Sequence, residues 1–127
     1  MIKYYYAQDI TEQIEKIVKK LRMQHVDTSR LVCVRSKGSS SKRIIARCHA
    51  LPRIMQFALG TNAYYIIEII SEQFDGMSEE EQAKTLIHEL MHIPKSFGGG
   101  FKFHNIVNRR NVDDMYRKFL KTEMCKD

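Results

Sequence analysis

Two histidines spaced one helical turn apart, with a glutamate between them, are the residues best suited to chemistry in this chain. Residues 88–92 read His-Glu-Leu-Met-His and fit the pattern H-E-x-x-H. Because residues four apart share one face of a helix, His88 and His92 can reach the same ion. Zinc accepts such nitrogen ligands and keeps a position for water in catalytic sites. Glu89 stands where a general base could take a proton from that water as it attacks a peptide carbonyl.

The segment around this motif predicts the helix that must carry it. Ser78 is a good N-cap, and Glu81 completes a capping box. Pro94 disfavours helical geometry in the residue before it, so the helix should end near Ile93. At about 100° per residue, the apolar side chains gather on the side away from both histidines. They are Ala83, Leu86, Ile87, Leu90 and Met91. This separation favours a metal site over a pair of core histidines, and exposed histidines on a helix surface remain the alternative.

A catalytic zinc site needs a third protein ligand, and His104 is the leading candidate. Three glycines at 98–100 allow the chain to turn back after Pro94. The alternative is that His104 is a surface residue at the start of the next helix. Carboxylates further along the chain could also complete the site. These are Asp113, Asp114 and Glu123.

Residues 88–104, HELMHIPKSFGGGFKFH, resemble the signature of a phage and archaeal metallopeptidase family, and more distantly the SprT-like zincins. The resemblance implies a zincin-like α+β fold, in which a small, mostly antiparallel sheet packs on the active-site helix between N- and C-terminal helices. It also implies a Zn²⁺ cofactor, a peptide or protein substrate that adds a strand beside the sheet, and a third histidine ligand near His104. SprT-like relatives act on protein attached to DNA.

The rest of the chain predicts elements on either side of this helix. Apolar residues at helical spacing indicate an amphipathic helix over residues 8–25, and a final helix should run from His104 or Asn105 to about Met124. Residues 30–35 and 43–48, separated by turn residues, predict a β-hairpin with a long loop. Residues 63–70 predict a buried strand. Residues 51–59 are apolar but contain Pro52, which indicates a strand or irregular structure.

Length and composition limit the class of protein. The 127 residues fit one domain, so we expect residues 1–127 to form a single metallopeptidase domain. No segment has the roughly 18 to 20 apolar residues of a membrane span, and we expect no secretory signal. Three cysteines without C-x-x-C spacing indicate a reducing compartment, so we expect a cytoplasmic protein.

Three functions fit these observations. The first is a zinc metallopeptidase with Glu89 as the general base. The second is a nucleic-acid-associated domain with a structural zinc, because the net charge is +6, although the basic residues are spread along the chain and indicate only weak contact. The third is a zinc-binding protein without turnover. Glu89 favours the first, since a structural zinc site does not need that acid.

Two further groups have competing interpretations. Glu68 is the one acid in an apolar strand. It could orient a zinc-bound histidine, or form a salt bridge to Arg47 or Arg53. Cys48 and His49 could form a metal pair, but neighbouring side chains of a strand point to opposite faces.

Overall fold

A computed structural model describes residues 1–102 and 106–124 as an α+β protein built on a small mixed sheet. The strand order is β1-β2-β4-β3, with two parallel strands in the centre and an antiparallel strand at each edge. The strands are β1 (Lys3–Tyr6), β2 (Leu31–Lys37), β3 (Ala46–Ala50) and β4 (Tyr65–Ile70).

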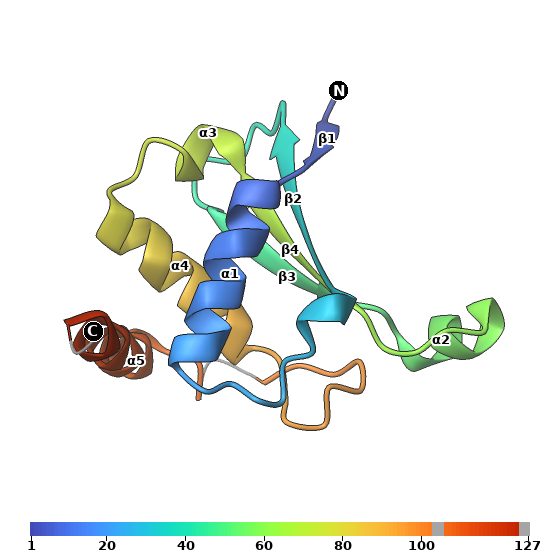
Figure 1. Ribbon diagram of the computed structural model, residues 1–127. Helices are drawn as coiled ribbons and strands as arrows, with labels where there is room; N and C mark the ends of the chain where they lie inside the picture. Colours follow the sequence, from blue (N-terminus) through green and yellow to red (C-terminus); the bar gives the residue numbers. More distant parts are fainter. Residues whose placement is uncertain (103–105, 125–127) are drawn as a thin grey trace.

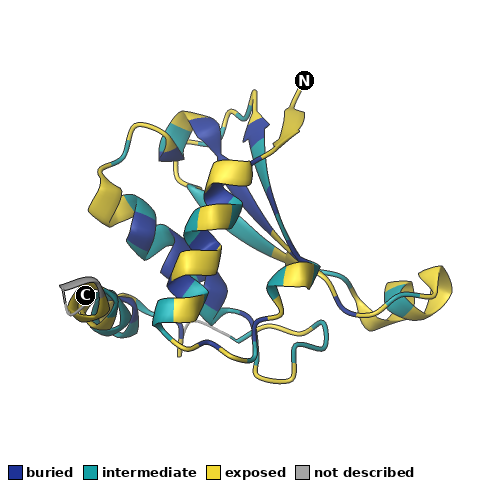
Figure 2. Ribbon diagram, viewed as in Figure 1, coloured by how far each residue is buried: buried dark blue, intermediate teal, exposed yellow. Residues whose placement is uncertain are grey.

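Helices cover one face of the sheet, where α1 and α4 lie side by side (Figure 1). The helices are α1 (Gln8–Lys20), α2 (Arg53–Leu59), α3 (Ser71–Phe74), α4 (Glu79–Met91) and α5 (Arg109–Met124), with a 3-10 turn at Thr28–Arg30. Figure 2 shows that the buried residues concentrate where α1, α4 and the sheet meet. No helix in the described ranges is both long and apolar enough to cross a bilayer.

Strand β4 lies in the centre, and five of its six residues are buried. Tyr65, Ile67 and Ile69 are fully buried in the core formed with α1 and α4. Glu68 and Ile70 on the opposite face are buried as well. Ile66 on that face is 38% exposed, so β4 is buried along the whole helix-covered face but only in part on the other.

The predicted hairpin between residues 30–35 and 43–48 is wrong. Strands β2 and β3 do not pair with each other, because β4 lies between them. Cys33 and Cys48 are both aligned with Ile67, one on each side of it, and both are free thiols. Placing the most buried strand, β4, between β2 and β3 therefore outweighs pairing the two strands that are closer in sequence.

Other element boundaries also differ from the sequence-based expectations. Residues 53–59 form helix α2 instead of a strand or irregular structure. Pro52 occupies its N-cap, where its missing N–H removes no helical hydrogen bond. Helix α1 ends at Lys20, not near residue 25. Helix α5 begins at Arg109, later than expected, while residues 103–105 lie outside the described residues.

Candidate active site

Helix α4 positions the H-E-x-x-H motif, and its start and end follow the sequence signals. The Ser78 side chain accepts a hydrogen bond from the backbone N–H of Glu81, 3.2 Å away. His92 is the C-cap, and the N–H of Ile93 donates to the carbonyl of Leu90 over 3.1 Å. The predicted capped helix is therefore confirmed, and it carries His88 on its last turn and His92 at its C-cap.

The two histidines converge on one point. Their Nε2 atoms lie 3.3 Å apart, with the rings nearly perpendicular. Two nitrogens bound to one tetrahedral zinc at about 2.0–2.1 Å would lie about 3.3–3.4 Å apart. The Nδ1–H of His92 donates to the carbonyl of Lys102 over 2.7 Å, which leaves the lone pair of Nε2 facing His88. The donor set therefore fits a zinc ion.

Glu89 is buried beside this pair, with only 7% of its surface exposed. Burial raises the pKa of its carboxyl to about 8, although a hydrogen bond from the backbone N–H of Cys48 acts in the opposite direction. The carboxyl is therefore held between the motif helix and the edge strand β3.

Strand β3 forms one wall of an open cleft. The N–H of Leu51 donates to Tyr64 and the N–H of Ile70 donates to Ile45. In an antiparallel ladder, backbone groups alternate in direction, so those of Ala46, Cys48 and Ala50 point away from β4. Two hollows of about 590 and 530 Å³ lie along this edge and share Ile44, Ala46, His88 and Glu89 as lining residues. Within residues 1–102 and 106–124 no strand pairs with this outer edge of β3, and the motif lies midway along the groove beside it.

The third ligand cannot be placed, because His104 lies outside the described residues. Within residues 1–102 and 106–124, no group of three metal-binding side chains is present. Asp113 lines the cleft with His88 and is 3.2 Å from the ammonium of Lys84. Asp114 pairs with Arg117. The side chain of Glu123 also lies outside the described residues.

The glycine-rich segment is fastened to the core by contacts that the sequence did not reveal. The Tyr65 hydroxyl accepts from the N–H of Gly99 over 2.9 Å and donates to the carbonyl of Gly100 over 2.8 Å. The N–H of Lys102 donates to the carbonyl of His92 over 2.8 Å. In the sequence, the run of three glycines indicated only that the chain could turn back here. Nothing in the buried strand indicated that Tyr65 would bind this segment.

Glu68 does not contact the motif histidines in the structure. It lies on the sheet face away from the helices, 2.8 Å from His49 Nε2 and 3.4 Å from Arg47. The alternative of a salt bridge to Arg47 is therefore confirmed. Burial raises the pKa of Cys48 to about 12, so its thiol is poorly suited to a metal pair with His49.

Comparison with known proteins identifies the family. A family model described as "Putative phage metallopeptidase" matches residues 2–121. The chain belongs to that family. The family resemblance, which the sequence showed in residues 88–104, therefore extends over residues 2–121. No curated protein and no solved structure gives a significant match.

Proposed function

We propose that this metallopeptidase-family chain is a zinc-dependent peptidase of the H-E-x-x-H type. The observation that carries the proposal is the pair of Nε2 atoms 3.3 Å apart beside the carboxyl of Glu89. His88 and His92 would hold the ion, and we propose His104 as the third ligand. Zinc, when bound, would supply Lewis-acid activation of water and of the peptide carbonyl.

The chain's own groups account for the remaining chemistry. Glu89 takes a proton at its carboxylate from the attacking water and delivers it to the departing amine. Its burial excludes bulk water from that transfer. Lys102 orients His92 through its backbone carbonyl, so that Nε2 faces the cleft.

The edge of β3 supports an extended polypeptide as the substrate. The backbone N–H and C=O groups of Ala46 and Ala50 point away from β4, and Ala46 lines the cleft, so a substrate strand can pair along this edge. Pairing through the backbone positions a peptide bond beside Glu89 without requiring a particular side chain. A polypeptide in extended conformation is therefore a better fit than a folded surface.

Zinc content and proteolysis test this proposal together. The purified chain should bind about one zinc ion and cleave an unfolded protein such as casein, and a chelator should abolish cleavage. His88→Ala and His92→Ala should each lose the metal. His49→Ala is the matched control, because its ring lines the same cleft but bonds to Glu68, so this variant should retain zinc. Full zinc occupancy in both motif variants would refute the proposal.

A basic cluster supports a second candidate function, contact with nucleic acid. At the end of α1, a hollow of about 580 Å³ is lined by four basic residues, Lys16, Lys19, Lys20 and Arg22, with Glu15 and Thr122. The sequence indicated an even spread of these charges, whereas the fold brings four of them to one hollow beside α5. A phosphate backbone fits such a cluster. Glu89 does not line this hollow, so contact with nucleic acid would leave the buried carboxylate of the motif unexplained.

A further inference from the structure

Helix α2 presents an unusual apolar surface to solvent. Ile54, Met55, Phe57 and Leu59 are 76%, 46%, 87% and 67% exposed. Figure 1 shows α2 projecting beyond the end of the sheet, away from α1, α4 and α5, and Figure 2 shows that most of it is exposed. Large contiguous apolar patches on a protein surface mark interaction sites. We call the four exposed side chains the apolar arm.

The arm is firmly attached at its base. Gln56 donates through Nε2 to the carbonyls of Leu51 and Gly98, over 2.9 and 3.2 Å. Gly60 ends the helix in the left-handed conformation, with φ of 65°. The helix thus uses a polar side chain toward the protein and turns its large apolar ones outward, the reverse of an ordinary surface helix. This arrangement presents the arm to another molecule.

The arm continues the line of the cleft. Arg53, the first residue of α2, lies only three positions after Ala50, the last residue of β3. Phe101 lines the cleft and is 42% exposed. Its ring lies 6.2 Å from that of Tyr65, which is aligned with Ala50. Phe101 therefore lies toward the end of β3 from which the chain leaves for α2.

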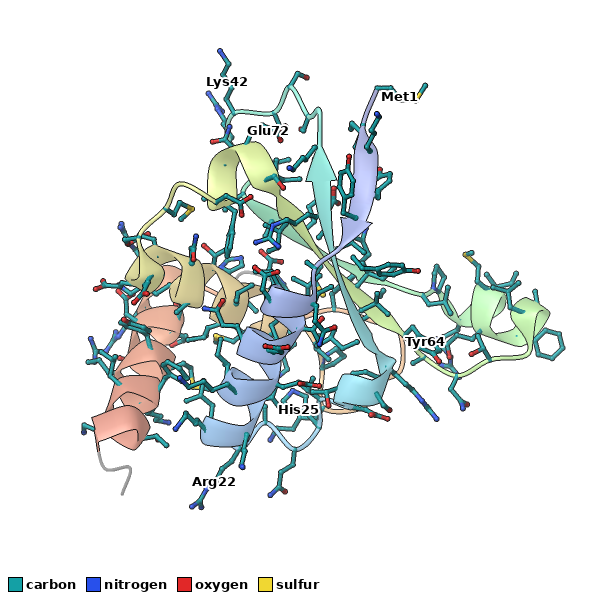
Figure 3. All side chains as sticks on the ribbon, turned by 45° about the horizontal axis from the view of Figure 1, so that its top comes forward. Met1, Arg22, His25, Lys42, Tyr64 and Glu72 are labelled. Atoms are coloured by element: carbon teal, nitrogen blue, oxygen red, sulfur yellow. The ribbon has the colours of Figure 1, made fainter. Side chains whose placement is uncertain are left out.

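The chain returns from α2 through Tyr64, which adds apolar surface at the base of the arm. Figure 3 shows Tyr64 beside the connection between α2 and β4. Its carbonyl accepts from the N–H of Leu51, so both sides of the connection are held together. A polypeptide lying along the outer edge of β3 and leaving at this end would pass Phe101 and then meet the arm.

We propose that the apolar arm is an exosite that binds apolar side chains of the substrate polypeptide outside the cleft. This inference rests on the peptidase function proposed above and specifies its substrates as extended, apolar polypeptides. The N–H of Cys48 bonds to Glu89 and so marks the position of the motif along β3. Arg53 at the start of α2 is five positions further on, which is at most about 18 Å from Cys48 along an extended chain. A substrate must therefore continue roughly five residues past the reacting bond to reach the arm.

Peptide length separates cleft binding from arm binding. The probes are fluorescein-labelled peptides of six and sixteen residues with alternating leucine and serine, titrated by anisotropy against zinc-loaded Glu89→Gln protein. The sixteen-residue peptide should bind more tightly than the six-residue one, and Phe57→Ser should reduce this ratio of affinities about tenfold. Tyr6→Ser is the matched control, because Tyr6 is 89% exposed on the outer strand β1 and should leave the ratio unchanged.

Three results would overturn the exosite. If Phe57→Ser leaves the ratio of affinities unchanged, or weakens the binding of both peptides equally, the arm does not act on long substrates. If sedimentation shows a dimer that Phe57→Ser dissociates, the arm binds a second copy of the chain. Failure of the peptidase function gives a different pattern, in which the zinc-loaded wild type cleaves no polypeptide while the length-dependent binding at Phe57 persists.

Discussion

The Glu89→Gln variant should lose activity and, in the metal-free protein, gain stability. The unfolded chain ionises this carboxyl near its ordinary pKa of 4.5, whereas burial keeps it protonated in the folded, metal-free chain up to about pH 8. A folded-state pKa raised above the unfolded value means that stability falls as pH rises from 4.5 to 8. Glutamine fills the same space without ionising, so it removes this loss.

The size of the stability effect follows from the two pKa values. A pH of 7 lies about 2.5 units above the pKa of this carboxyl in the unfolded chain. Its ionisation there therefore favours unfolding by about 3 kcal/mol. At pH 5 the corresponding effect is about 1 kcal/mol. The loss of a general base should reduce kcat about 10²- to 10⁴-fold. Zinc should remain bound, because the two histidine nitrogens are unchanged.

Urea denaturation with a chelator at pH 5 and pH 7 measures the first effect, and casein cleavage with zinc measures the second. The advantage of Glu89→Gln over the wild type should grow by about 2 kcal/mol between the two pH values. If the difference in free energy of unfolding between the variant and the wild type is the same at both pH values, burial does not raise the pKa of Glu89 in the folded chain. Cleavage equal to that of the wild type would disprove its role as the base.

Four further predictions concern the metal site, the sheet, the glycine-rich segment and the basic surface. His104→Ala should lose zinc and activity while retaining its helices by circular dichroism, whereas Asp113→Ala should keep zinc by metal analysis; the reverse pattern would assign the third ligand to a carboxylate. Burial raises the pKa of Glu68, but its hydrogen bond to His49 and nearby positive charge outweigh this and lower it overall. Glu68→Gln should therefore reduce the free energy of unfolding by about 1–3 kcal/mol at pH 7, and this loss should fade in urea titrations as pH falls below 4.5. Gly99 has φ of 111° and a Cβ there would lie 2.9 Å from the Leu51 carbonyl; Gly99→Ala should cost about 1–3 kcal/mol in thermal denaturation, while Gly76→Ala, with open space around it, should not. Duplex DNA should bind weakly and be released by about 150 mM salt in anisotropy titrations; tight binding at about 200 mM salt would favour the nucleic-acid function instead.

The sequence was most informative where the signals were local. The capping of α4 by Ser78 and the arrangement of His88, Glu89 and His92 depend on residues within a few turns of one helix. Helical spacing alone therefore predicted which side chains converge. A buried strand was also predicted over residues 63–70, because its β-branched residues favour a pleated, buried segment, and β4 forms within it at Tyr65–Ile70.

Strand order and surface contacts could not be predicted in this way. The choice of β4 as the partner of both β2 and β3 depends on how completely the whole sheet is buried, which no single segment reveals. Residues 51–59 were expected to form a strand or irregular structure, and nothing in the segment indicated that the apolar side chains of α2 would be exposed, because only the fold determines where that segment lies. The bond between Glu89 and the backbone of Cys48 joins distant segments and left no trace in the sequence.

Among the residues that the structure describes, no strand covers the outer edge of β3, and this edge bears on how the protein avoids aggregation. An unpaired strand edge is a template on which other chains, including copies of the same chain, can pair and aggregate. Here the edge strand is only five residues long and carries the charge of Arg47, and the outward N–H of Cys48 already bonds to Glu89. An incoming strand must compete with that carboxyl for the N–H. The glutamate of the H-E-x-x-H motif thus also protects the sheet against uncontrolled edge-to-edge growth.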